Sequence, residues 1–156
     1  MFDSCRRDIH YLRLSVTDRC NLRCRYCFVQ KEPERMTLET AKGAARFLME
    51  NAGAANAGAP EMNFFGGEPM LMYDSVIKPL VEWVHDELGE NMRFSITTNG
   101  TLLPRRGQAL SGVHKVSVSL HSFEGNDCPG SMEEYLSGVW DFCRRASAEG
   151  TLCALR

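Results

Sequence analysis

The sequence lacks three features, each of which would point to a particular class of protein. Its net charge is only −2 over 156 residues, so it has no electrostatic footprint for nucleic acid. It has no apolar run long enough to cross a bilayer. Its first residues lack the long apolar core of a signal peptide. We therefore expect a globular protein of the cytoplasm that binds neither nucleic acid nor membrane.

The seven cysteines do not indicate a disulfide framework, because their number is odd and no secretory leader is present. In a reducing cytosol their thiols remain available for metal. With 44% hydrophobic and 24% charged residues, the composition suffices for one core, and we expect residues 1–156 to form one domain. Four cysteines are scattered without ligand spacing and are interpreted as ordinary thiols: Cys5, Cys128, Cys143 and Cys153.

The other three cysteines, Cys20, Cys24 and Cys27, have the spacing Cys-x3-Cys-x2-Cys and follow a predicted strand at 11–16. Three thiolates on one short loop can bind three corners of a cubane [4Fe–4S] cluster and leave the fourth iron without a protein ligand. Since such clusters normally take four cysteines, an open iron indicates that another molecule binds there. The alternative is a zinc site, but structural zinc usually takes four ligands, often as two separated pairs.

Two further motifs follow predicted strands. The strand at 61–65 leads into 66–69 (GGEP), where two glycines permit positive φ and a close approach of the backbone to a ligand. We therefore expect a side chain at Gly67 to block binding of the ligand and to leave the cysteine loop unchanged. The alternative is that the two glycines form only a turn. The strand at 94–97 ends in 98–101 (TNGT), and Asn-Gly favours a turn with left-handed dihedral angles.

In these motifs the sequence resembles the radical S-adenosylmethionine (SAM) enzymes. The cysteine loop, with Tyr26 just before the third cysteine, is accompanied by 63–69 (NFFGGEP) and 97–103 (TTNGTLL). The order and separation of the motifs fit the family over nearly the whole chain. In that family the amino and carboxylate groups of SAM chelate the fourth iron. An electron from the reduced cluster then cleaves a carbon–sulfur bond, which gives methionine and a 5′-deoxyadenosyl radical.

The resemblance implies two cofactors, a [4Fe–4S] cluster and SAM, and a set of site residues. The cluster would be held by the three cysteines of the loop. Tyr26 would approach the adenine, and the backbone at 66–68 would hold the methionyl part of SAM. The candidates for binding the cofactor are Tyr26, Gly66, Gly67, Glu68, Pro69, Thr98, Asn99, Ser117, Ser119 and His121.

The last three candidates lie in or directly after a strand predicted at 116–120, which alternates strictly between apolar and polar residues. Ser117 and Ser119 share one face with His121, because side chains alternate along a strand. If that face lines a barrel interior, these groups would meet the SAM ribose or the substrate. Many members of the family carry aspartate where His121 stands, and a lone histidine is more often a hydrogen-bonded structural residue.

The predicted strands alternate with amphipathic helical stripes at 38–48, 76–88 and 135–146, which predicts an α/β fold with a parallel sheet and right-handed crossovers. In the second stripe, Pro79 must lie in the first turn or bend the helix. The resemblance implies a partial (β/α)6 barrel with about four and a half β/α units present. Because a strand follows Gly150 with no element after it, we expect the barrel to be incomplete at its C-terminus.

The chemistry is better determined by the sequence than the substrate. The segment 14–22 (LSVTDRCNL) resembles the GTP cyclase of molybdopterin biosynthesis, whereas 64–69 (FFGGEP) resembles sulfatase-maturing and other peptide-modifying members. We expect a radical SAM enzyme that acts on a peptide or protein, with a GTP cyclase-like enzyme as the alternative. From another class, the chain could be a non-catalytic Fe–S or zinc-binding module. An enzyme would also need an electron donor such as flavodoxin or ferredoxin.

Overall fold

The computed structural model describes residues 9–30, 32–52, 58–89, 92–103, 110–120 and 130–156. In these ranges five parallel strands form one sheet in the order β1-β2-β3-β4-β5. The strands are β1 (Tyr11–Thr17), β2 (Glu61–Gly66), β3 (Arg93–Thr98), β4 (Val113–Val118) and β5 (Leu152–Leu155). Each strand lies parallel to the strand that precedes it in the sequence, so a crossover connection must carry the chain back between the two. This arrangement confirms the predicted α/β class.

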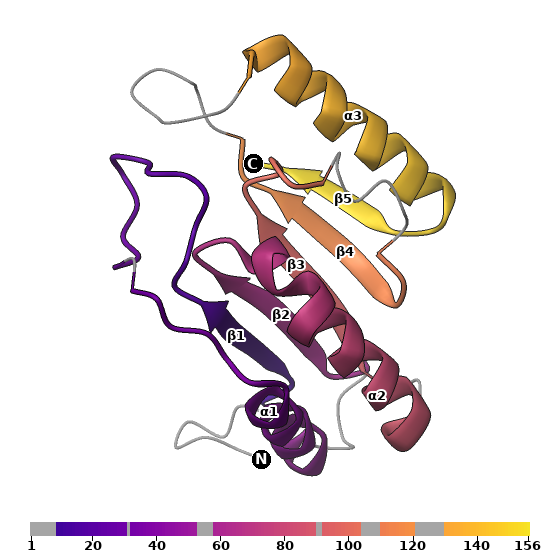
Figure 1. Ribbon diagram of the computed structural model, residues 1–156. Helices are drawn as coiled ribbons and strands as arrows, with labels where there is room; N and C mark the ends of the chain where they lie inside the picture. The colour runs from indigo at the N-terminus through magenta and orange to yellow at the C-terminus, as the bar shows by residue number, and fades with distance from the viewer. Residues whose placement is uncertain (1–8, 31, 53–57, 90–91, 104–109, 121–129) are drawn as a thin grey trace.

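Three α-helices run along one face of this sheet: α1 (Leu38–Asn51), α2 (Lys78–Leu88) and α3 (Met132–Ala148) (Figure 1). Two of them begin at caps that the sequence encodes. The Thr37 hydroxyl accepts from the Thr40 amide at 3.1 Å, and Ser131 and Glu134 form a capping box. Within the described ranges, no helix is long and apolar enough to span a bilayer.

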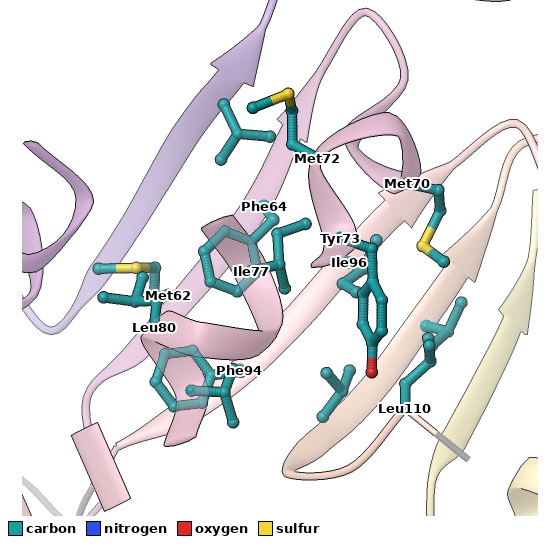
Figure 2. Close-up of a cluster of buried hydrophobic side chains, with 14 of the residues drawn as sticks. Met62, Phe64, Met70, Met72, Tyr73, Ile77, Leu80, Phe94, Ile96 and Leu110 are labelled. Carbon is teal, nitrogen blue, oxygen red and sulfur yellow. The ribbon is translucent and has the colours of Figure 1, made fainter. Parts of the chain in front are cut away.

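The hydrophobic core lies between the sheet and these helices. Phe64 of β2 and Phe94 of β3 stack with their ring centroids 5.8 Å apart. Figure 2 shows the two rings among buried methionine and aliphatic side chains that come from the same strands, from the segment 69–77 and from α2. Because side chains alternate along a strand, burying one face in this way presents the other set of residues to the opposite side of the sheet.

The opposite face of the sheet is polar and forms its own hydrogen bonds. Asn63 Nδ2 donates to Ser95 Oγ at 2.9 Å, and Thr97 Oγ1 donates to Asn63 Oδ1 at 3.3 Å. The Ser95 hydroxyl also donates to Glu61 Oε1 at 2.6 Å. The sheet therefore has an apolar face under the helices and a polar face that leads up to the loops at the strand ends.

The stripe predicted as one helix at 76–88 is in fact divided between the last two of three consecutive elements. A 3-10 turn, η1 (Pro69–Met72), is followed by a π turn, η2 (Tyr73–Ile77), and then by α2. Of the two places expected for Pro79, the first turn of α2 is correct. A proline is tolerated there because its missing N–H would have had no partner inside the helix.

The strand predicted at 116–120 was placed too late along the chain. The structure begins β4 at Val113 and ends it at Val118, so that Ser119 lies just beyond it. The charged and polar residues His114 and Lys115 conceal the start of the strand from a hydrophobicity pattern. Pairing decides the boundary instead, because Val113 faces Phe94 in β3 and Lys115 faces Leu152 in β5.

Candidate functional site

A pocket of about 200 Å³ lies at the C-terminal ends of β1, β2 and β3. Loops at this end of a parallel sheet are where such folds bind ligands. Figure 1 shows the loop after β1 extending past the strand ends on this side. Of the predicted site residues, the pocket is lined by Cys20, Cys24, Cys27, Tyr26, Gly66, Gly67, Thr98, Asn99 and Ser119.

Three predicted residues are not brought into this lining, and a fourth is not described by the structure. Glu68 and Pro69 are buried in the turn below the pocket. Ser117 is buried within β4, where only 4% of it is exposed, while its neighbour two residues along does reach the pocket. His121 lies outside the described residues, so its predicted role stays a prediction.

Backbone hydrogen bonds connect the glycine motif to the end of β1 and to the cysteine loop. The Gly67 amide donates to the Thr17 carbonyl at 2.7 Å, and the Glu68 amide donates to the Arg19 carbonyl at 2.8 Å. A Cβ atom at Gly67 would lie 2.2 Å from the Arg19 carbonyl oxygen, and one at Gly66 would lie 2.3 Å from that of Thr17. The two loops therefore approach each other too closely for any side chain.

This contact corrects the expectation that a side chain at Gly67 would block a ligand and spare the cysteine loop. The space that the missing side chain leaves is taken by the backbone of the cysteine loop itself. The amide groups of Gly67 and Glu68 are also engaged in that contact. What remains for a ligand at this position is carbonyl oxygen, which accepts from a cation such as an ammonium group.

The Glu68 side chain turns inward instead of toward the pocket, and it is fully buried. Its Oε1 accepts from the Thr98 hydroxyl at 2.7 Å and from the Met70 amide at 3.0 Å, and its Oε2 accepts from the Asn99 amide at 2.8 Å. Burial raises the pKa of this carboxyl above its usual value, although the bonds from Asn99, Thr98 and Met70 oppose the shift. Glu68 thus connects the glycine motif to the end of β3.

Asn99 carries this connection on to the first cysteine. Its Nδ2 lies 3.7 Å from Cys20 Sγ and donates to Asn21 Oδ1 at 3.0 Å. Its Oδ1 accepts from the amide and the hydroxyl of Thr101 at 2.9 and 2.7 Å, which fixes the orientation of the amide. The Leu22 amide also donates to Cys20 Sγ, at 3.4 Å. Two N–H donors directed at one sulfur favour its deprotonated form, the thiolate.

A match to the radical SAM superfamily covers residues 14–153. The chain belongs to the radical SAM superfamily. It is 34% identical over 153 residues to a probable GTP 3′,8-cyclase of Methanocella arvoryzae, which covers 89% of this chain and 45% of that protein. It is 37% identical over 159 residues to the GTP 3′,8-cyclase of Pelotomaculum thermopropionicum, which covers 96% of this chain and 46% of that protein. The chain thus spans about half the length of the curated relatives it matches.

Solved radical SAM structures share the fold. Native anSMEcpe with bound AdoMet and a Cp18Cys peptide superposes with a TM-score of 0.64 at 19% identity, covering 93% of this chain and 42% of that one. BtrN in complex with AdoMet and 2-DOIA gives a TM-score of 0.63 at 23% identity, covering 95% of this chain and 57% of that one. At these identities the likeness shows the fold, and it confirms the predicted partial radical SAM barrel.

Radical SAM enzymes use a [4Fe–4S] cluster and SAM, which confirms the two cofactors expected from the motifs. Among the described residues no three cysteine, histidine or acidic side chains converge on a point where one metal ion would sit. Cys20, Cys24 and Cys27 nevertheless line one pocket, each partly exposed and outside any disulfide. A cubane spreads its thiolates over three irons, whereas tetrahedral zinc needs them around one centre. The donor set therefore fits a cluster better than a zinc ion.

Sequence reasoning missed Arg13, which also lines the pocket. Its guanidinium lies over the Phe65 ring, 4.3 Å from the ring centroid. It is the one charged side chain among the described residues of the lining. The signal that could have found it is alternation, because Arg13 stands on the polar face of β1, whose other face, with Leu14 and Val16, is buried.

Proposed function

We propose that the chain forms a site of reductive SAM cleavage and that the resulting radical takes a hydrogen atom from a substrate. The observation that carries this proposal is the meeting of three cysteine thiols, the glycine motif and Asn99 around one pocket at the strand ends. When bound, the two cofactors supply the chemistry: one electron from the cluster cleaves a carbon–sulfur bond of SAM to methionine and a 5′-deoxyadenosyl radical. The protein's part is to bind, orient and shield them.

Each part of the pocket has a role in this proposal. The three cysteine thiolates hold the cluster, and the Asn99 amide supports the first of them. The carbonyl oxygens at the glycine motif accept the ammonium group of SAM, because the amides there are already engaged. Tyr26, whose side chain is 70% exposed in the cysteine loop, and Phe28 offer aromatic faces for the adenine and shield it from water.

For the substrate we propose a phosphorylated nucleotide such as GTP, which reverses the preference for a peptide drawn from sequence alone. Two findings support it. The curated relatives at 34% and 37% identity are GTP 3′,8-cyclases, and the charged side chain of the pocket is a cation, Arg13. An exposed guanidinium with no carboxylate beside it in the lining suits a phosphate. A peptide substrate stays the alternative prediction.

The test is SAM cleavage by the anaerobically reconstituted 156-residue chain with dithionite as reductant. We expect 5′-deoxyadenosine to form, GTP to accelerate its formation, and a Cys-containing peptide to have no effect. Arg13→Leu should abolish the acceleration by GTP and keep the slow cleavage that needs no substrate. No 5′-deoxyadenosine from a preparation with full iron and sulfide content would reject the enzyme. Acceleration by the peptide and not by GTP would reject only the proposed substrate.

A further inference from the structure

The cysteine loop borders a second hollow. A hollow separate from the cofactor pocket is lined by Arg19, Cys20, Arg23, Cys24, Glu32 and Pro33, and we call it the outer hollow. It shares only Cys20 and Cys24 with the pocket. The same two predicted cluster ligands therefore border two separate hollows, the pocket and the outer hollow.

The outer hollow is positively charged, in contrast to the chain as a whole. The lining residues Arg19 and Arg23 are exposed, as is Arg25 elsewhere in the cysteine loop, and no carboxylate among the described residues forms an ion pair with these arginines. Residues 18–30 contain these three arginines and one acid, Asp18, a local balance of +2, whereas the chain carries −2. Among the described residues that line the hollow, Glu32 is the single acid.

We propose that the outer hollow is the docking surface of an acidic one-electron carrier protein that reduces the cluster. This inference rests on the proposed function, because reductive SAM cleavage consumes one electron for each event. The pocket is occupied by SAM and substrate in that function, so a carrier must reach the cluster from outside the pocket, and the outer hollow borders two of the same cysteines. There the ligands Cys20 and Cys24 are the first atoms of the cluster site that it meets.

The charge of the hollow identifies the class of partner. Exposed arginines attract an oppositely charged surface over roughly a Debye length, about 8–10 Å at physiological salt, and raise the rate of encounter. Electron-transfer encounters are small and short-lived, which suits a few cations around a hollow and needs no large apolar patch. The step itself forms and breaks no bond, since one electron leaves the carrier and the cluster gains it.

The experiment uses the reconstituted 156-residue chain with a purified flavodoxin as the carrier and measures two quantities. One is the affinity for oxidised flavodoxin by calorimetry, which involves no turnover. The other is the rate of electron transfer from reduced flavodoxin by stopped flow. Photoexcited 5-deazariboflavin serves as a small neutral reductant that needs no docking surface. The variants are Arg23→Glu, the double variant with Arg19→Glu, and Glu32→Lys.

We expect the double variant to lose about tenfold or more in the rate of electron transfer from flavodoxin at low salt, with Arg23→Glu intermediate. Glu32→Lys should raise the rate, and the differences should shrink at high salt. Cluster reduction by deazariboflavin should stay unchanged in all of them. Arg93→Glu, the same change in charge at the opposite end of β3, is the matched control and should behave like the wild type.

Other outcomes would overturn the inference. Equal flavodoxin rates and affinities in the wild type and the double variant would show that the carrier docks elsewhere. A raised KM for GTP with deazariboflavin as reductant would assign the arginines to the substrate instead. If flavodoxin binds and reduces the cluster as expected but SAM is not cleaved, the docking surface stands and the proposed function fails.

Discussion

The Oε2 atom of Glu68 accepts a hydrogen bond from the backbone amide of Asn99 at 2.8 Å, between two motifs that lie 31 residues apart in sequence. The side chain of Asn99 in turn contacts the first cysteine of the loop, because its Nδ2 lies 3.7 Å from Cys20 Sγ. An acid that does not line the pocket thus positions the amide that contacts Cys20, the first of the three predicted cluster ligands. Glu68 is in this respect a positioning residue, and Asn99 is the group through which it acts.

The first prediction concerns the pH dependence of stability. Burial raises the folded-state pKa of Glu68 above its unfolded value, so the folded state keeps the proton to a higher pH. The contribution of this carboxyl is therefore fully present below the unfolded pKa and is lost as pH rises through the folded pKa. We expect the stability of the wild type, measured by urea unfolding relative to Glu68→Gln, to fall as pH rises above about 4.5. A difference that grows with pH would mean that the three hydrogen bonds outweigh burial.

The second prediction concerns the potential of the cluster. A hydrogen bond to a ligating sulfur stabilises the additional negative charge of the reduced state. Asn99→Ala removes the Nδ2 donor to Cys20 Sγ and should lower the reduction potential. A tenfold decrease in the equilibrium constant for one-electron reduction of the cluster corresponds to a reduction potential lower by about 59 mV. The measurement is a redox titration followed by electron paramagnetic resonance without SAM, so that loss of a SAM contact plays no part.

Thr97→Val is the matched control for this potential. Thr97 lines the same pocket, and its hydroxyl donates to Asn63 Oδ1 and to no cysteine. Its variant should therefore keep the wild-type potential. An Asn99→Ala potential equal to that of the control, or higher than it, would show that the 3.7 Å contact has no electrostatic effect on the cluster.

The third prediction concerns Gly67. An alanine Cβ there would lie 2.2 Å from the Arg19 carbonyl oxygen, so the cysteine loop must move. We expect Gly67→Ala to lower the free energy of unfolding by about 1–3 kcal/mol or more and to reduce the iron and sulfide content of the reconstituted protein. Gly43→Ala is the control, because nothing lies within 4 Å of a Cβ at that position of α1. It should stabilise the helix by about 0.5–1 kcal/mol. A Gly67 variant with full cluster content that fails only to bind SAM would restore the interpretation drawn from sequence.

Most of the fold could be predicted from the sequence because its signals are local. The strands predicted at 11–16, 61–65 and 94–97 correspond to β1, β2 and β3, and the stripes predicted at 38–48 and 135–146 correspond to α1 and α3. The start of β4 could not be predicted in this way, because it depends on pairing with β3 and β5. The π turn before α2 was also missed, since a stripe of apolar residues does not distinguish a π turn from an α-helix.

For the candidate site, too, some features could be predicted from the sequence and others could not. The spacing of Cys20, Cys24 and Cys27 predicts them as cluster ligands, because ligands on one loop are neighbours in sequence, and the structure brings the three residues to one pocket. The functions of Glu68 and Gly67 could not be assigned from sequence, because each depends on a partner from another loop, Asn99 for the first and Arg19 for the second. These contacts across loops exist only once the parallel sheet has brought the strand ends together.

The most direct test of the account is the electron paramagnetic resonance spectrum of the reduced, reconstituted chain with and without SAM. The wild type should give the signal of a reduced [4Fe–4S] cluster, and SAM should change that signal by binding at the open iron. Cys24→Ala should lose the cluster, whereas Cys143→Ala, at a buried thiol in α3, should keep both the signal and the response to SAM. A Cys24 variant that still assembles a full cluster responding to SAM would contradict the assignment of the site.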